Sequence, residues 1–367
     1  MDRAREVRTP GAVISTGRLA PFHLVPKLSQ AIWGGDALVT RFGKAGDPHV
    51  AIGESWECFD ANRLRGGAFD GRTLAEARAE LGAALMGPID AAAAFPVLTK
   101  FIDARAALSV QVHPDDAYAQ RVEGQPNGKT ECWYILGADP GAELVLGWTR
   151  DTDRTEYERR VADGTLGEIL RRVPVQRGDA FYLPAGTLHA IGAGIRVFET
   201  QQTSDLTYRI FDWNRLEPDG TPRELHVKKA GDVLDYRACE AGAVRQLRFD
   251  DGGVDRTLLI ADERFLVEFL IVSPRGERIA SDGRPLTITL LSNPCGLRAG
   301  GAVAHVPAYG SVVTAADAEV IEFEPNDGGV DALVVRPKPD LERARNAALG
   351  AGLDAMQVDD FFAQFAR

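Results

Sequence analysis

Two histidines, a glutamate and a glutamine have the side chains and the spacing for a divalent metal site. Gln111 and His113 are two residues apart in the apparent strand SVQVHP, so both side chains face the same side of a sheet. Glu131 begins a further apparent strand, ECWYIL. His189 follows a Pro-Ala-Gly turn and lies at the beginning of another apparent strand. Nitrogen and oxygen ligands without a thiolate suit Zn²⁺, Fe²⁺, Mn²⁺ or Ni²⁺, with open positions left for a substrate.

The combination of these residues carries the prediction, because a single histidine on a strand is more often a packed or exposed residue than a ligand. The four remaining histidines of the chain lack comparable neighbours: His23, His49, His226 and His305. A glutamine, a glutamate and two histidines on neighbouring strands therefore indicate a metal site where one imidazole alone would not.

The elements that must hold these side chains are short strands. From residue 95 to about 215, segments rich in β-branched and aromatic residues alternate with Gly, Pro, Asp or Asn, as in FPVLTKFID, ECWYILG and IRVFETQ. This pattern predicts an antiparallel sandwich or barrel. The Ala/Leu/Glu-rich residues 72–87 predict a surface helix, and the charged insertion at about 153–172 predicts a helix packed outside the barrel.

The pattern of short apolar segments returns after about residue 256, in TLLIA, FLVEFLIVS, LTITLLS, EVIEFE and DALVVRP. These segments predict a second, smaller β domain. We expect three parts in the chain: a flexible arm over residues 1–20, a metal-binding domain over 21–235, and a second domain over 236–367 that ends in a helical tail.

Composition and charge limit the possible partners. The 367 residues are 45% hydrophobic and 26% charged, which excludes a disordered or fibrous protein. Acidic residues exceed basic ones by 11 with no long basic block, which argues against a nucleic-acid partner. An anionic small molecule stays possible, because two or three well-placed cations can hold one phosphate.

The location of the protein follows from similar arguments. No apolar run approaches the ~20 residues of a membrane helix, and the start MDRAREVRTPGAV lacks the hydrophobic stretch of a secretory signal. The four cysteines are far apart without a CxxC motif, which predicts reduced thiols. We expect a cytoplasmic protein without a membrane partner, either a monomer or a small homo-oligomer.

The segment around His189 resembles the second cupin motif, G-x5-P-x-G-x2-H-x3-N. Gly178, Pro184, Gly186 and His189 occupy its positions, and Ala193 replaces the final asparagine. The resemblance implies a cupin fold, which hosts many chemistries. The fold class we expect is mainly β, with two cupin-like β-barrel or jelly-roll domains and a few surface helices.

The second domain departs from this motif. In GAVAHVPAY (301–309), Tyr309 stands where the glycine would be, Val312 stands where the histidine would be, and His305 falls at a different offset. We therefore expect a metal-free cupin-like domain that packs against the first one.

Longer motifs of the sequence resemble those of the type I phosphomannose isomerases. IWGG, IGESWE, FPVLTKFIDA, LSVQVHPDD, GKTECWYIL, LPAGTLHAIG and SDLTYRIFDWNR occur in the order found in that family's shorter bacterial members, from about residue 26 to 215. The resemblance implies an aldose–ketose isomerase that interconverts mannose 6-phosphate and fructose 6-phosphate through a cis-enediol. It also implies one zinc ion per chain, with these ligands: Gln111, His113, Glu131 and His189.

The same resemblance implies roles for five further residues. Arg209 matches the catalytic arginine of the family, Lys129 a catalytic position in the pocket, and Lys100 and Ser109 positions that bind the substrate. Asp205 belongs to the same SDxxxR word and is expected to bind substrate. An arginine stays protonated at neutral pH, so Arg209 could stabilise an enediolate but would be a poor proton carrier. The general base stays open among a lysine, a metal-bound water and a carboxylate.

Each of these residues has a plainer interpretation. Lys100 could extend its ammonium group from the strand to the surface, and Arg209 could pair with Asp205 outside the sheet. Trp56 is interpreted as a packing residue, and the Asp115–Asp116 pair as a helix N-cap with an acid in the first turn.

Two other classes of function compete with the isomerase. One is a different metal cupin enzyme, either an isomerase of another sugar phosphate or an Fe²⁺ oxygenase, which would give no role to Arg209 or the lysines. The other is a non-catalytic sugar-binding cupin, which predicts loss of a ligand or of the arginine. All of these residues are present, so the sequence favours the isomerase.

Overall fold

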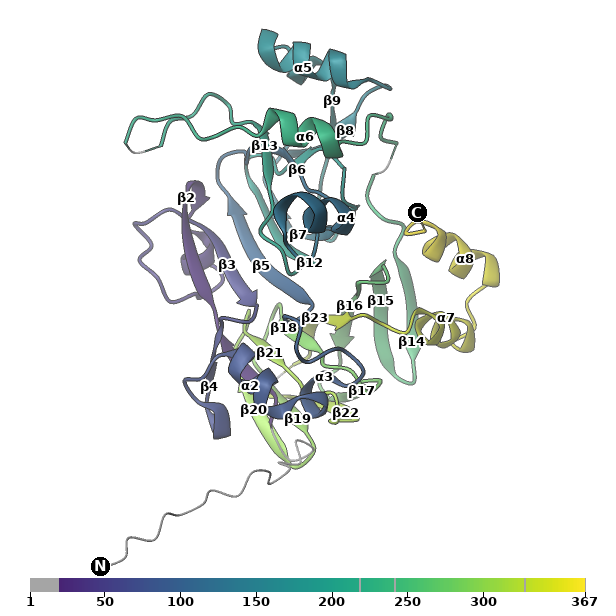
Figure 1. Cartoon of the computed structure of the whole chain (residues 1–367). Helices are drawn as coiled ribbons and strands as arrows, with labels where there is room; N and C mark the ends of the chain where they lie inside the picture. The colour runs from purple at the N-terminus through teal and green to yellow at the C-terminus, as the bar shows by residue number, and fades with distance from the viewer. Residues whose placement is uncertain (1–19, 218, 241, 327, 367) are drawn as a thin grey trace, which may run out of the picture.

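The computed structural model describes residues 20–217, 219–240, 242–326 and 328–366, so nearly all of the predicted N-terminal arm lies outside the described residues. Figure 1 shows strands as the dominant element, with helices on the periphery. The strands form four antiparallel sheets, and the prediction of a mainly β fold is confirmed. Within the described residues the sheets are open and face each other in pairs, without a closed barrel.

The first sandwich has a six-stranded and a five-stranded sheet. The six-stranded sheet has the order β10 (Ala180–Leu183), β7 (Glu131–Ala138), β12 (Ile195–Gln202), β5 (Val97–Ala104), β2 (Lys27–Gly35) and β3 (Ile52–Cys58). The facing sheet has the order β13 (Tyr208–Phe211), β6 (Val110–Val112), β11 (His189–Ala190), β8 (Glu143–Trp148) and β9 (Leu170–Pro174). Between them lies a core of apolar side chains that includes Ile102, Trp133, Ile135, Leu144 and Val197.

The second sandwich has an eight-stranded sheet and a four-stranded one. The large sheet has the order β14 (Leu247–Asp251), β15 (Val254–Ala261), β16 (Phe265–Val272), β23 (Val330–Pro337), β18 (Thr287–Leu290), β21 (Ser311–Val313), β1 (Phe22–Val25) and β4 (Arg63–Arg65). The small sheet has the order β17 (Glu277–Ala280), β22 (Val320–Pro325), β19 (Cys295–Ala299) and β20 (Ala302–Val306). Two N-terminal strands, β1 and β4, thus complete a sheet that is otherwise built from the C-terminal part. The boundary at residues 235 and 236 stays a prediction.

The helices are short and differ in extent from the sequence prediction. The predicted helix over residues 72–87 is divided at Gly82, whose φ of +52° interrupts it, and the helix predicted at 153–172 ends at Gly164 in the left-handed conformation. No helix of the described part is long and apolar enough to cross a membrane. The helices are α1 (Ala37–Thr40), η2 (Gly67–Phe69), α2 (Leu74–Leu81), α3 (Ala83–Met86), α4 (Asp116–Tyr118), η3 (Ala119–Glu123), α5 (Arg154–Asp163), η4 (Leu166–Ile169), α6 (Val227–Val233), α7 (Leu341–Gly350) and α8 (Ala355–Ala363).

A buried ion pair connects the two sandwiches. Lys44 Nζ lies 2.6 Å from Glu57 Oε1 and donates to the carbonyl of Tyr309 at 2.7 Å. Ser311 of β21 donates to Glu57 Oε2 at 3.0 Å, and Ser55 donates to Oε1. Because Glu57 lies on β3 of the first sandwich, its carboxylate holds that strand against the second sheet.

The substitution Lys44→Met should lower the free energy of unfolding by about 3 kcal/mol, because it leaves the buried Glu57 carboxylate without its cation. Urea denaturation followed by circular dichroism measures the change. The double variant Lys44→Met/Glu57→Gln should be less destabilised than the single one. Arg159→Met, which removes an exposed partner of Asp163, is the control and should change little. Equal stability of Lys44→Met and the wild type would contradict a stabilising role for the Lys44–Glu57 ion pair.

Candidate metal centre and active site

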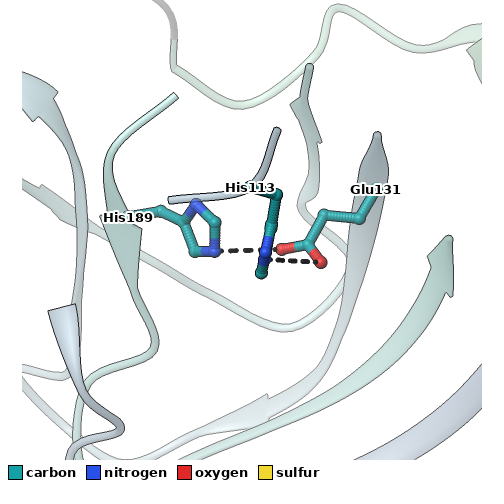
Figure 2. Close-up of side chains that lie close together, drawn as sticks. All are labelled: His113, Glu131 and His189. Carbon is teal, nitrogen blue, oxygen red and sulfur yellow. Dashed lines mark ion pairs between the residues drawn. The ribbon is translucent and has the colours of Figure 1, made fainter. Parts of the chain in front are cut away.

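Figure 2 shows three side chains directed toward one another inside the first sandwich: His113, Glu131 and His189. His189 begins β11 and His113 follows β6 in one sheet, whereas Glu131 begins β7 in the facing sheet. Their potential ligand atoms lie within 4.8 Å of one another, and each side chain is at most 2% exposed. The two sheets thus bring together three of the four residues that the sequence predicted as ligands.

Backbone carbonyls determine which nitrogen of each imidazole carries the proton. His189 Nδ1 lies 2.9 Å from the Thr187 oxygen, and His113 Nδ1 lies 2.8 Å from the Leu206 oxygen. A carbonyl can only accept, so each Nδ1 donates and each neutral ring presents the lone pair of Nε2. These lone pairs face Glu131, at 3.2 Å from His189 to Oε1 and 3.4 Å from His113 to Oε2. Acceptors that face acceptors need positive charge between them, and Lys129 Nζ, 3.3 Å from His113 Nε2, supplies part of it. Two imidazole nitrogens and a carboxylate are also a donor set that fits a divalent metal ion.

Charge and burial favour the ligand forms of all three residues. Burial would raise the pKa of Glu131, but Lys129 and the two imidazoles hold it well below its usual range. Burial and the nearby Lys129 lower the pKa of His113 to about 3, and burial also lowers the pKa of His189. A carboxylate with two neutral imidazoles is the protonation state that binds metal. Neither oxygen of Glu131 accepts a hydrogen bond, although Lys129 Nζ forms an ion pair at 2.6 Å.

The register of the five-stranded sheet places Gln111 beside the cluster of His113, Glu131 and His189. Gln111 pairs with His189 on one side and with Arg209 on the other, so the three side chains occupy one row on one face. Its amide nitrogen is 3.3 Å from His189 Nε2, and Ser109 Oγ is 3.4 Å from its amide oxygen. Rotation of the amide by half a turn would present the oxygen to the site. The role of Gln111 as fourth ligand stays a prediction.

Two buried lysines lie on the opposite wall. Lys100 Nζ is 3.3 Å from Glu199 and 3.6 Å from Glu54, and it lies 4.8 Å from the centre of the Trp56 ring. Burial alone would lower the pKa of Lys100, but Glu199 and Glu54 outweigh it and raise the pKa. Lys100 is therefore a buried cation and does not extend to the surface. Lys129 Nζ is 3.3 Å from His113 Nε2.

The sequence interpretation missed two glutamates and the role of one tryptophan. Glu199 on β12 pairs in register with Lys100 and with Trp133, whose indole donates to Glu199 Oε2 at 3.0 Å. Trp56 was expected only to pack, yet it covers Lys100 and donates to Glu54 at 2.7 Å. The sequence of β12 contained one signal for Glu199. Along the inward face of β12 the residues change from Ile and Val to Glu and Gln, at positions 195, 197, 199 and 201.

Arg209 is half-buried on β13 and has no carboxylate partner among the described residues. Its Nη1 donates to the Glu224 carbonyl at 2.9 Å, its backbone N–H donates to His226 Nδ1 at 3.2 Å, and its Nε has no hydrogen-bond partner. Burial and the nearby Arg223 lower the pKa of Arg209. The guanidinium is thus a cation with donors still available, on the same face as Gln111.

Two aspartates singled out from the sequence, Asp205 and Asp115, have different surroundings. Asp205 is exposed, and in the described parts of the chain no hydrogen bond or ion pair joins it to Arg209 or to the metal-site residues, so its substrate role stays a prediction. Asp115 is the N-cap of α4 and accepts from the Tyr118 amide at 2.7 Å, which confirms the prediction of a helix cap.

Comparison with known proteins agrees with this geometry. Residues 22–135 match the sequence model described as "Phosphomannose isomerase type I, catalytic domain". The mannose-6-phosphate isomerase of Streptococcus mutans is 39% identical over 251 residues, which cover 67% of this chain and 77% of that protein. The mannose-6-phosphate isomerase ManA of Bacillus subtilis is 43% identical over 220 residues, or 59% of this chain and 68% of that one.

A solved structure extends the similarity to most of the chain. The crystal structure of the mannose 6-phosphate isomerase from Bacillus subtilis has a TM-score of 0.79 at 31% identity, and the match covers 86% of this chain and 99% of that one. Two facing sheets with a His–Glu–His cluster between them define a cupin-type β protein with a candidate metal site. The chain belongs to the type I phosphomannose isomerase family.

The substitution His189→Ala should abolish stable metal binding, because it removes one of the two imidazole lone pairs that face Glu131. Zinc per chain, measured by atomic emission after gel filtration, should fall at least about tenfold. His305→Ala, an exposed histidine of β20, is the matched control and should keep the wild-type content. Full zinc occupancy in His189→Ala would refute the ligand assignment.

Proposed function

We propose that this chain is a metal-dependent aldose–ketose isomerase that interconverts mannose 6-phosphate and fructose 6-phosphate through a cis-enediol, with one Zn²⁺ per chain. The observation that carries the metal dependence is the pair of imidazole lone pairs directed at the buried Glu131. Family membership supports the substrate. A bound divalent ion would polarise the oxygens at C1 and C2 and spread the negative charge that develops there.

The proton that moves between C1 and C2 needs a carrier inside the pocket. Lys100 is held as a cation by Glu199 and Glu54, so it fits the binding of anionic or hydroxyl oxygens better than proton abstraction. Lys129 is the amine next to the ligand carboxylate, with its Nζ 2.6 Å from Glu131. We propose Lys129 as a catalytic residue, and because it is paired with a carboxylate as Lys100 is, the proton carrier stays open among this amine, a metal-bound water and a carboxylate.

The charge of the enediolate needs a counterion that does not give up its proton. Arg209 meets this requirement, because a guanidinium stays protonated and this one has no carboxylate partner in the described structure. It lies in one row with Gln111 and His189, so its side chain faces the same space as the metal ligands. Ser109 and Asp205 are assigned to substrate binding, Ser109 through its contact with Gln111.

The substitution Arg209→Ala should leave the fold and the metal content unchanged and lower kcat by about 10²–10³-fold, since it removes a charge that acts on the transition state. Steady-state kinetics with mannose 6-phosphate measure the effect. The control is Arg237→Ala, an arginine that is 79% exposed and paired with Asp235, and it should have wild-type kcat. Normal turnover by Arg209→Ala would exclude Arg209 from the mechanism.

The proposed reaction is tested by a coupled assay for fructose 6-phosphate formed from mannose 6-phosphate. Activity should disappear with a chelator and return with Zn²⁺, and parallel reconstitution with Fe²⁺ and Mn²⁺ compares the metals. Activity that survives complete metal removal would contradict the metal dependence. Metal-loaded, folded protein that turns over a different aldose phosphate would correct the substrate, and protein that only binds sugar would favour the sugar-binding cupin.

A further inference from the structure

The interior of the second sandwich carries charged side chains at one end. Glu268 on β16 lies two residues from Leu270, and Arg336 on β23 lies two residues from Val334, so each shares a face with an apolar core residue. Arg256 on β15 pairs in register with Leu270 and therefore faces the same side. The strands thus direct two guanidiniums and one carboxylate into the space between the sheets, where the rest of that face is apolar.

The three charges form one buried cluster. Glu268 Oε1 is 2.8 Å from Arg256 Nη1, and Oε2 is 2.6 Å from Arg336 Nε. Arg336 also donates to the Ala280 carbonyl at 2.8 Å and to Asp282 at 3.1 Å. Apolar side chains would close this end of the core at a lower cost in desolvation than three buried charges. The stability of the fold therefore does not by itself account for the cluster.

A cavity of about 400 Å³ opens beside the cluster, between the two sheets and α7. Its wall contains more arginines than carboxylates, in a chain with a net charge of −11. The arginines are Arg256, Arg278, Arg284, Arg336 and Arg343, and the acids are Asp251, Glu268, Asp282 and Asp340. The volume suits a small phosphorylated molecule.

Some of the donors in this wall have no acidic partner. Arg284 donates to the carbonyls of Lys338 and Asp282, and none of the described carboxylates forms an ion pair with it. Arg256 pairs with Glu268 at 2.8 Å and with Asp251 at 3.1 Å through its Nη atoms, but its buried Nε has no hydrogen-bond partner. The partner of Arg278 is Glu322, which lies outside the wall. The guanidinium of Arg284 and the Nε of Arg256 are therefore available to an oxyanion while Glu268 stays paired with Arg336.

We propose that this cavity of the second sandwich is a binding site for the phosphate group of a small phosphorylated metabolite, separate from the metal centre. Guanidinium groups bind phosphate oxygens through paired, charge-assisted hydrogen bonds, and Arg284 and Arg256 supply donors of this kind. Arg343, which is 60% exposed, adds a third guanidinium to the lining, and its Nε is paired with Asp282 at 2.8 Å. The site does not depend on the isomerase reaction, because none of its residues lies in the first sandwich.

The test is equilibrium dialysis of the metal-loaded full-length chain against inorganic phosphate. We expect two classes of phosphate site in the wild type. Arg284→Gln should weaken one class at least about tenfold, since a hydrogen bond to a charged group is lost. The other class, at the active site, should be unchanged in Arg284→Gln. Arg275→Gln, which removes an exposed charge outside the cavity, should leave both unchanged.

Arg343→Gln is a second variant for the same cavity and should weaken the same class as Arg284→Gln. A single class of site that neither cavity variant weakens would overturn the proposal. A class that responds to the cavity variants in a protein without isomerase activity would support the cavity site and reject only the catalytic assignment. Competition of mannose 6-phosphate with phosphate at the Arg284-dependent class would distinguish a sugar phosphate from the free ion.

Discussion

Two neutral imidazoles point their unprotonated nitrogens at one buried carboxylate, and this arrangement of acceptors needs positive charge between them. The carbonyls of Thr187 and Leu206 maintain it, because they bind the other nitrogen of each ring. The strand order maintains it as well, since the two histidines lie in one sheet and Glu131 begins a strand of the facing sheet. Lys129 supplies one positive charge at Glu131. A metal ion in the same space would satisfy both imidazoles at once.

The two sandwiches share one arrangement of inward-facing side chains but differ in the chemistry of their polar residues. In each, the inward faces are apolar along most of their length and carry charged or polar side chains in one region. The first sandwich places histidine, glutamate and lysine there, a set suited to a metal and a sugar phosphate. The second places arginine and glutamate there. The expectation of a cupin-like partner without the ligand histidine, based on Tyr309 and Val312, did not anticipate this charged cluster.

The sequence predicted those parts of the site that depend on local patterns, such as alternation within a strand or a turn before it. Alternation within strands placed Gln111 and His113 on one face, and the turn before His189 marked the next strand. Glu199 and Glu54 were missed because their roles depend on strand pairing: Glu199 lies opposite Lys100, and Glu54 lies opposite Ile102, two residues along the same strand. No local pattern contains this register. The helix predicted at 153–172 was too long, because Gly164 ends it in the left-handed conformation. The resemblance to a family, and not the spacing, selected Arg209 and the lysines.

The pairing of β1 with β21 affects how the chain can be synthesised and folded. Phe22 lies opposite Val313, about 290 residues later, so one edge of β1 has no partner until almost the whole chain has left the ribosome. β4 can cover the other edge early, since it follows β1 closely along the chain. Contacts of such high sequence separation form late and leave a strand edge open to other chains meanwhile. Nascent chains of this protein would therefore depend on rapid completion, or on a chaperone, to avoid edge-to-edge association.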